Sequence, residues 1–121
     1  MFRITDQHFG AFREQLVDNY ALTLAARIQE RFPDELRKLG MDPQQALPFV
    51  KRSMDKAKHY QVVRTLDVEL FVDCCILLTP DFDKSPEFPW AGETLCRDDL
   101  DGTAKMDLIH DYLVFATNKA R

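Results

Sequence analysis

The sequence has no long hydrophobic run, only four glycines and only three cysteines. Its longest apolar run, residues 74–78, is far shorter than the roughly 20 residues that span a bilayer. The first residues, Met1 to Asp6, lack the continuous apolar stretch of a signal peptide. An odd number of cysteines is a poor disulfide framework. We therefore expect a cytoplasmic protein that does not contact a membrane.

Excess positive charge is also missing. Sixteen Lys and Arg against twenty Asp and Glu give a net charge of −4, which offers no case for nucleic-acid binding. The charge is unevenly spread, because residues 1–60 carry ten basic against eight acidic residues and residues 61–121 carry six against twelve. Such asymmetry predicts that the two halves attract each other or face different partners.

Motifs of known catalytic or metal chemistry are absent from the sequence. There is no His-Glu-x-x-His, no paired Cys-x-x-Cys, no phosphate-binding glycine loop and no Gly-x-Ser-x-Gly elbow. The run that starts at Asp81 begins like a calcium loop, but Pro86 stands where glycine is needed and Gly92 where the bidentate Glu belongs. Cys96 could meet a histidine in the fold, yet nothing singles out that pair. We expect no enzyme activity, no cofactor and no metal ion.

The most apolar segment is Thr65–Leu78, which predicts a helix buried on most sides, with the other helices packed against it. Asp73 lies in the middle of this helix and must reach solvent, a cation or backbone donors, because burying it unpaired is costly. Cys74 and Cys75 are interpreted as two small buried hydrophobic residues, with a vicinal disulfide or reactive pair as the alternative.

Five further helices are expected from apolar spacing, caps and breakers. They cover Thr5 or Asp6 to Phe32, Pro33 to Leu39, Pro43 to about His59, Pro89 to Leu95, and Thr103 to about Asn118. Asp42 should cap the third of these, with Gln45 completing a capping box. The expected buried stripes are Phe9, Phe12, Leu16, Tyr20, Leu24 and Ile28; Leu47, Val50, Met54 and Ala57; and Met106, Ile109, Leu113 and Ala116, widened by Tyr112 and Phe115. The sequence predicts an all-α fold, a single domain over 1–121 built as an irregular bundle of five to six helices around the central helix at about 65–78.

Two segments are candidates for partner binding. The helix that carries Lys51, Arg52, Lys56 and Lys58 is the most basic, and presents either a solvated face or a docking surface for an acidic partner or for the chain's own acidic half. The loop after the central helix mixes carboxylates and aromatic rings, which either plug the bundle or form a binding hot spot. The candidate residues are Asp81, Phe82, Asp83, Phe88, Trp90, Lys51 and Arg52.

The sequence resembles a group of small helical proteins encoded among the spike, PAAR, adaptor and effector genes of bacterial type VI secretion clusters. The residues that carry the resemblance are Asp67-Val68, Phe71-Val72-Asp73, Asp81-Phe82-Asp83, Pro89-Trp90-Ala91 and Lys105-Met106-Asp107, which with the helix at Pro43–His59 cover the C-terminal two thirds. Pro80 stands where a glycine is expected before the Asp-Phe-Asp run. The resemblance implies protein–protein contact with an effector, an adaptor or a PAAR-type protein, and it assigns no catalytic residues.

Two functions follow as expectations. The first is a non-enzymatic accessory protein or co-chaperone that holds an adaptor or effector segment in an apolar groove and so assists loading. The alternative is an immunity protein that neutralises a cognate toxin through an acidic surface. The acids that would form this surface are Asp81, Asp83, Glu87, Glu93, Asp98, Asp99 and Asp101.

Overall fold

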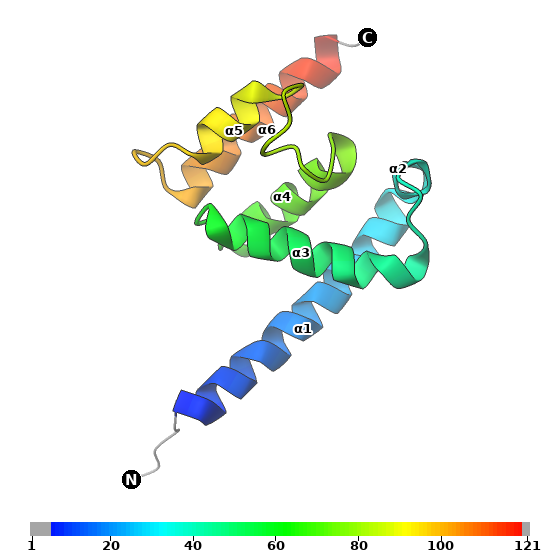
Figure 1. Cartoon of the computed structure of the whole chain (residues 1–121), viewed down its shortest axis with the longest axis vertical. Coiled ribbons are helices and arrows are strands. Elements are labelled where there is room, and N and C mark those ends of the chain that lie inside the picture. The colour runs from blue at the N-terminus through cyan, green and yellow to red at the C-terminus, as the bar shows by residue number, and fades with distance from the viewer. Residues whose placement is uncertain (1–5, 120–121) are drawn as a thin grey trace. The chain divides into compact units, whose positions relative to one another are not determined.

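All regular secondary structure in the part of the chain that the structure describes is helical (Figure 1). The structure, a computed structural model, describes the backbone of residues 6–119 and the side chains of residues 16–115. The helices are α1 (Asp6–Arg31), α2 (Pro33–Lys38), the short 3-10 helix η1 (Pro43–Gln45), α3 (Ala46–His59), α4 (Thr65–Leu77), α5 (Pro89–Leu95) and α6 (Gly102–Lys119). Residues 6–119 contain no strand, so the predicted all-α fold with five to six α-helices is confirmed. None of the described helices is both long and apolar enough to cross a membrane.

The chain divides into two compact units, Met1–Val50 and Lys51–Arg121. The first unit holds α1, α2, η1 and the beginning of α3, and the second holds the rest of α3 with α4, α5 and α6. A single domain over 1–121 stays a prediction.

In the first unit, α1 packs against α2 and buries a stripe of small and branched side chains. Ala21, Leu24, Ala25 and Ile28 are buried on α1, and Leu36 is buried on α2. The predicted α1 stripe is therefore confirmed for Leu24 and Ile28 and wrong for Leu16, which is 52% exposed. The six residues of α2 contact only part of a helix about 39 Å long. The predictions for Phe9 and Phe12 lie outside the described side chains.

The start of the third predicted helix is confirmed in detail. The Asp42 carboxylate accepts from the Gln45 N–H at 3.1 Å, and the Gln45 side chain accepts from the Asp42 N–H at 3.0 Å. This capping box opens η1, which leads directly into α3. Pro48 falls in the first turn of α3, where a missing N–H costs no helical hydrogen bond. The buried stripe differs slightly from the prediction, because Val50 and Ala57 are buried, Leu47 and Met54 are only half-buried, and Phe49 and Ser53 are buried instead.

The second unit is organised around α4. Seven consecutive or nearly consecutive α4 side chains are buried: Val68, Phe71, Val72, Asp73, Cys74, Cys75 and Ile76. Helix α4 packs on α6, and α6 packs on α5, so the prediction of a buried central helix is confirmed (Figure 1). Asp73 is only 9% exposed, which rules out the solvent-facing position considered for it. No buried side-chain polar atom among the described residues lacks a hydrogen-bond partner, as the cost of burial requires.

A close backbone approach joins the start of α6 to the end of α3. Gln61 has a φ of +67°, and the Val62 N–H returns to the Ala57 carbonyl at 2.9 Å, which closes the last turn of α3. A Cβ atom on Gly102 would lie only 2.1 Å from the Gln61 carbonyl oxygen, so no larger residue fits there. The buried Lys105 of α6 donates to the Tyr60 carbonyl at 3.1 Å and places a cation at the C-terminal end of α3.

The C-terminal part of α6 departs from its predicted burial. Met106 and Ile109 are buried as predicted and Leu113 is half-buried, whereas Ala116 lies outside the described side chains. Tyr112 and Phe115 were expected to widen the buried face, but they are 45% and 64% exposed. That prediction is wrong because apolar character at helical spacing does not distinguish a core-facing ring from a surface ring.

The cysteines lead to a prediction on thiol reactivity. Cys74 and Cys75 are free and fully buried, and burial raises the pKa of both thiols, that of Cys75 to about 12. Cys96 is free and exposed. Because the thiolate is the reactive form, we expect an aromatic disulfide reagent at pH 8 to modify Cys96 rapidly and the other two thiols only after unfolding. Fast reaction of all three thiols in the folded protein would contradict the buried placement of α4.

Candidate protein-interaction site

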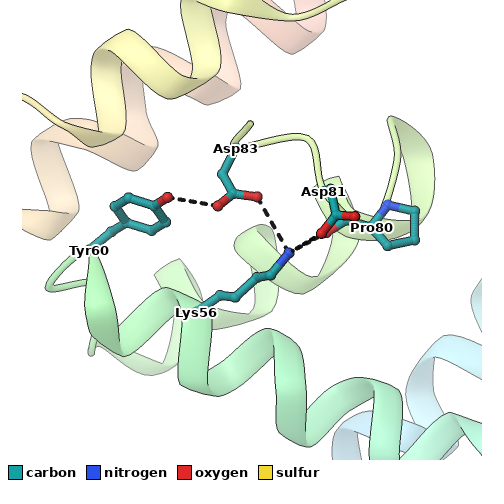
Figure 2. Close-up of polar contacts among 5 residues, drawn as sticks. All are labelled: Lys56, Tyr60, Pro80, Asp81 and Asp83. Carbon is teal, nitrogen blue, oxygen red and sulfur yellow. Dashed lines mark hydrogen bonds and ion pairs between the residues drawn. The ribbon is translucent and has the colours of Figure 1, made fainter. Parts of the chain in front are cut away.

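A polar cluster in the second unit joins α3 to the loop that follows α4 (Figure 2). Tyr60 directly follows the last residue of α3, and its N–H bonds to the Lys56 carbonyl at 3.2 Å, so it lies one helical turn after Lys56. The Lys56 ammonium donates to Asp81 at 2.6 Å, to the Pro80 carbonyl at 3.0 Å and to Asp83 at 3.4 Å. The Tyr60 hydroxyl donates to the second oxygen of Asp83 at 2.7 Å. We call Lys56, Tyr60, Asp81 and Asp83 the lysine clamp.

The loop after α4 is held by two backbone turns and by the buried side chains of Phe82 and Asp83. The Phe82 N–H donates to the Thr79 backbone carbonyl, and the Lys84 N–H donates to the Asp81 backbone carbonyl. These two hydrogen bonds make two consecutive turns. Phe82 is fully buried with its ring 5.1 Å from that of Phe71 on α4. A Cβ atom on Gly92 would lie 2.6 Å from the Asp83 carbonyl oxygen, so Gly92 lets α5 approach this loop closely. The lysine clamp and Phe82 together fix the segment that leads into α5.

Charge and burial set the protonation of the lysine clamp. Burial alone would lower the pKa of Lys56, but the hydrogen bond to Asp81 and the charges of Asp83 and Asp81 outweigh it and raise this pKa. The hydrogen bond and charge of Lys56 lower the pKa of Asp81. Burial, followed by the hydrogen bond to Asp83, raises the pKa of Tyr60 strongly. At neutral pH the clamp therefore holds an ammonium and a neutral phenol.

These pKa shifts predict a loss of stability in alkali. Lys56 and Tyr60 have pKa values raised in the folded protein, so their contribution is complete below their ordinary values near 10 and declines as the pH rises above them. Near neutral pH we expect Tyr60→Phe to lower the free energy of unfolding by about 1–2 kcal/mol through the lost hydrogen bond to a carboxylate. The difference between this variant and the wild type, measured by urea unfolding, should shrink above about pH 10. A difference in the free energy of unfolding that stays constant to pH 11 would contradict the hydrogen bond from Tyr60 to Asp83.

In the loop that begins like a calcium site, the Lys56 side chain faces the two carboxylates. Asp81 and Asp83 both face the Lys56 ammonium, which supplies the positive charge that paired carboxylates need. Among the described residues, no group of three or more His, Cys, Asp or Glu side chains is placed to hold a metal ion.

An aromatic cluster links α5 to α6 on the surface of the second unit. Phe88 and Trp90 meet edge to face with ring centres 6.0 Å apart, and Trp90 stacks on Tyr112 of α6 at 5.2 Å. Phe88 and Trp90 are half-buried, whereas Tyr112 is exposed. Phe115, 64% exposed, lies one turn beyond Tyr112 on the same side of α6. We call Phe88, Trp90, Tyr112 and Phe115 the aromatic face.

Acidic side chains flank the aromatic face. Glu93 lies one turn after Trp90 on α5, Asp111 lies one turn before Phe115 on α6, and Asp107 lies one turn before Asp111. Glu87 directly precedes Phe88, and all four carboxylates are exposed. Within residues 16–115, none of these four carboxylates takes part in an ion pair or a hydrogen bond. We call Glu87, Glu93, Asp107 and Asp111 the acidic rim.

The predicted site residues fall into three groups. Lys51, Arg52 and Asp81 are exposed, Phe88 and Trp90 are half-buried, and Phe82 and Asp83 are buried. Phe82 and Asp83 are accordingly parts of the core and of the lysine clamp, and they offer no surface to a partner. Lys56 pairs with the chain's own acidic half, which was one of the interpretations of the basic helix.

Several members of these clusters were not predicted as site residues, namely Tyr60, Tyr112, Phe115, Asp107 and Asp111. Tyr60 was not considered at all, although its spacing of four residues from Lys56 signals a shared helix face. Tyr112 was assigned to the core, and no local pattern pairs it with Trp90, because the two rings are twenty-two residues apart and meet only after α5 folds onto α6.

Comparison of the chain with protein-family models, with curated proteins and with solved structures finds no significant match.

Proposed function

We propose that this chain is a non-enzymatic protein-binding accessory protein, a co-chaperone that acts in the cytoplasm. The observation that carries the proposal is the aromatic face, on which a Trp–Tyr stack and an exposed Phe stand together on two adjoining helices. Trp and Tyr dominate the binding energy of protein interfaces because they combine a large apolar area with a polar group. Four other exposed apolar side chains, Val63, Leu66, Leu77 and Val114, belong to the same unit, so its surface is rich in groups that a partner would cover.

The setting in type VI secretion comes only from the resemblance, which the short runs between residues 67 and 107 carry together with the helix at Pro43–His59. In that setting the partner is an effector, an adaptor or a PAAR-type protein, and the chain assists loading by shielding an apolar segment before secretion. The exposed rings of the aromatic face suit such transient contact, since they remain accessible in the free protein.

Co-expression with the proteins encoded beside it tests the proposal. The tagged chain should form a stable complex with one neighbouring effector, adaptor or PAAR-type protein, which should elute as one species in size-exclusion chromatography. The purification is repeated from low to physiological salt concentration, because low salt screens surface charges least. The proposal fails if none of these neighbours co-purifies at any of these concentrations.

The acidic surface supports a second candidate, an immunity protein that neutralises a toxin. Of its seven proposed acids, Asp81 and Asp83 bind Lys56, Asp99 binds Arg97, and Asp101 accepts from the Ala104 N–H. Glu87, Glu93 and Asp98 remain exposed without a partner in the described part of the chain. Growth of cells that express the neighbouring toxin decides between the candidates, because only an immunity protein rescues them. That rescue should be lost when Glu87, Glu93 and Asp98 are all changed to Ser.

A further inference from the structure

We infer that the aromatic face binds a segment of a partner protein in which Lys or Arg side chains alternate with apolar ones. This inference deepens the proposed function by assigning the surface and the chemistry of the partner. It is carried by the exposed rings together with two features of the surrounding charge, the acidic rim that has no partner within the described residues and the charge balance of this surface.

The first feature is that the carboxylates of this unit divide into two classes. Asp67, Asp81, Asp83, Asp99 and Asp101 hold the chain's own hydroxyl, ammonium, guanidinium or N–H groups. The acidic rim binds none of the described groups. The four rim carboxylates beside the aromatic face therefore have no partner within the described residues, and Asp55, Glu69 and Asp98 elsewhere in the unit share this property.

The second feature is the charge balance of this surface. Residues 87–115 contain seven acidic side chains against two basic ones. One of the two basic residues, Lys105, is buried, and the other, Arg97, is bound to Asp99. An acidic partner would meet like charges here, which costs binding energy, whereas a basic partner meets a complementary surface.

The rings and the acids favour the same kind of ligand. Arg and Lys bury their aliphatic stems on apolar surface and stack their charged heads on aromatic rings. A segment with such residues next to Leu or Ile could cover Tyr112 and Phe115 and direct its charges toward Glu93 and Asp111. Charge complementarity thus selects a basic amphipathic segment over a neutral or acidic one.

The test uses Trp90 as its own reporter, because it is the only tryptophan in the chain. The full chain is titrated with a synthetic amphipathic peptide of about 18 residues, five helical turns, made of Leu and Lys. A second peptide has the same pattern with Glu in place of Lys. We expect saturable change of the Trp90 fluorescence with the Leu/Lys peptide and none with the Leu/Glu peptide. Equal binding of both peptides, or of neither, would overturn the inference.

Matched variants locate the binding on the surface. Glu93→Lys with Asp111→Lys should weaken binding of the Leu/Lys peptide about tenfold or more, a change that two reversed rim charges are large enough to produce. The control variant, Glu30→Lys with Asp55→Lys, has the same net charge but alters exposed acids on α1 and α3, and should bind like the wild type. Equal loss in both variants would show that only net charge matters and would overturn the assigned surface.

The aromatic contribution is tested separately. Phe115→Ala should weaken binding several-fold while the thermal unfolding of the chain stays unchanged, since the Phe115 ring is mostly exposed. If the variant binds the peptide as the wild type does, the aromatic face is not the site. If the free wild-type chain is a dimer in sedimentation and Phe115→Ala makes it a monomer, the face is covered by a second copy and the inference is wrong.

These titrations need no identified partner, so their outcome is separate from that of the co-expression test. If the peptide binds at the aromatic face but no neighbour co-purifies, the proposed function is rejected and the assigned binding surface is retained. If the Glu93→Lys, Asp111→Lys variant forms the complex with a neighbouring protein as well as the wild type does, the proposed function is retained and the assigned binding surface is rejected.

Discussion

Replacing Lys56 with Met should lower the free energy of unfolding by about 2–4 kcal/mol. Removing one partner of a buried ion pair costs about 3–5 kcal/mol because the other charge stays behind in a low dielectric. Asp83 meets this condition, since its side chain is 2% exposed. The expected value is somewhat smaller because the Lys56 side chain is 32% exposed and the Tyr60 hydroxyl still donates to Asp83. Urea unfolding at pH 7, followed by circular dichroism, measures the loss.

Lys58→Met is the matched control for this prediction. Lys58 lies on the same helix two residues later, is exposed, and its ammonium has no polar partner in the described part of the chain. Its replacement should therefore change stability by less than about 0.5 kcal/mol. Adding Asp83→Asn to Lys56→Met should cost less than the two single changes together, because the stranded charge disappears. Similar stabilities of the Lys56→Met and Lys58→Met variants would show that the lysine clamp does not stabilise the fold.

Gly102→Ala is expected to have a comparably large effect, about 3–4 kcal/mol. The added methyl group would lie 2.1 Å from the Gln61 carbonyl oxygen and 2.9 Å from the Val62 Cα, and neither backbone atom can move aside as a side chain could. Either α6 or the last turn of α3 must shift, which also displaces Lys105 from the Tyr60 carbonyl. The loss is measured by the same unfolding experiment.

Gly40→Ala provides the comparison for Gly102. Gly40 has a φ of +70° with no atom within 4 Å of an added Cβ, so its replacement introduces only backbone strain of about 1–2 kcal/mol. A Gly102→Ala variant no less stable than Gly40→Ala would mean that α6 does not approach the Gln61 carbonyl as closely as described.

Local signals predicted the helices well because each has its own start or stop chemistry. Asp42 with Gln45, Pro89 at the first turn of α5, and the apolar α4 segment each specify a helix without reference to distant residues. The capping box and the buried α4 stripe are accordingly found where they were predicted.

The candidate site was less predictable because it is assembled from distant segments. Lys56 and Asp81 are twenty-five residues apart in the sequence. A run of mixed charges does not indicate which acidic residue will pair with Lys56. Phe82, Tyr112 and Phe115 are similar residues by hydropathy, yet Phe82 is fully buried and the other two are exposed. Burial depends on which helix face the neighbouring elements cover, and the sequence pattern alone does not contain that information.

The lysine clamp and the aromatic face are connected through the loop between them. Asp83 is bound to Lys56 and approached by Gly92 of α5, so the clamp fixes the start of the helix that carries Trp90. We therefore expect that Lys56→Met weakens partner binding as well as stability, whereas Lys58→Met affects neither.

Fluorine NMR of the partner complex tests most directly whether this chain works through its aromatic face. The chain is labelled with 5-fluorotryptophan, so its single tryptophan gives one resonance, and the unlabelled co-purified partner is added. The account predicts that the Trp90 resonance shifts or broadens as the complex forms. A resonance that stays unchanged at saturating partner, while size-exclusion chromatography shows the complex, would contradict it.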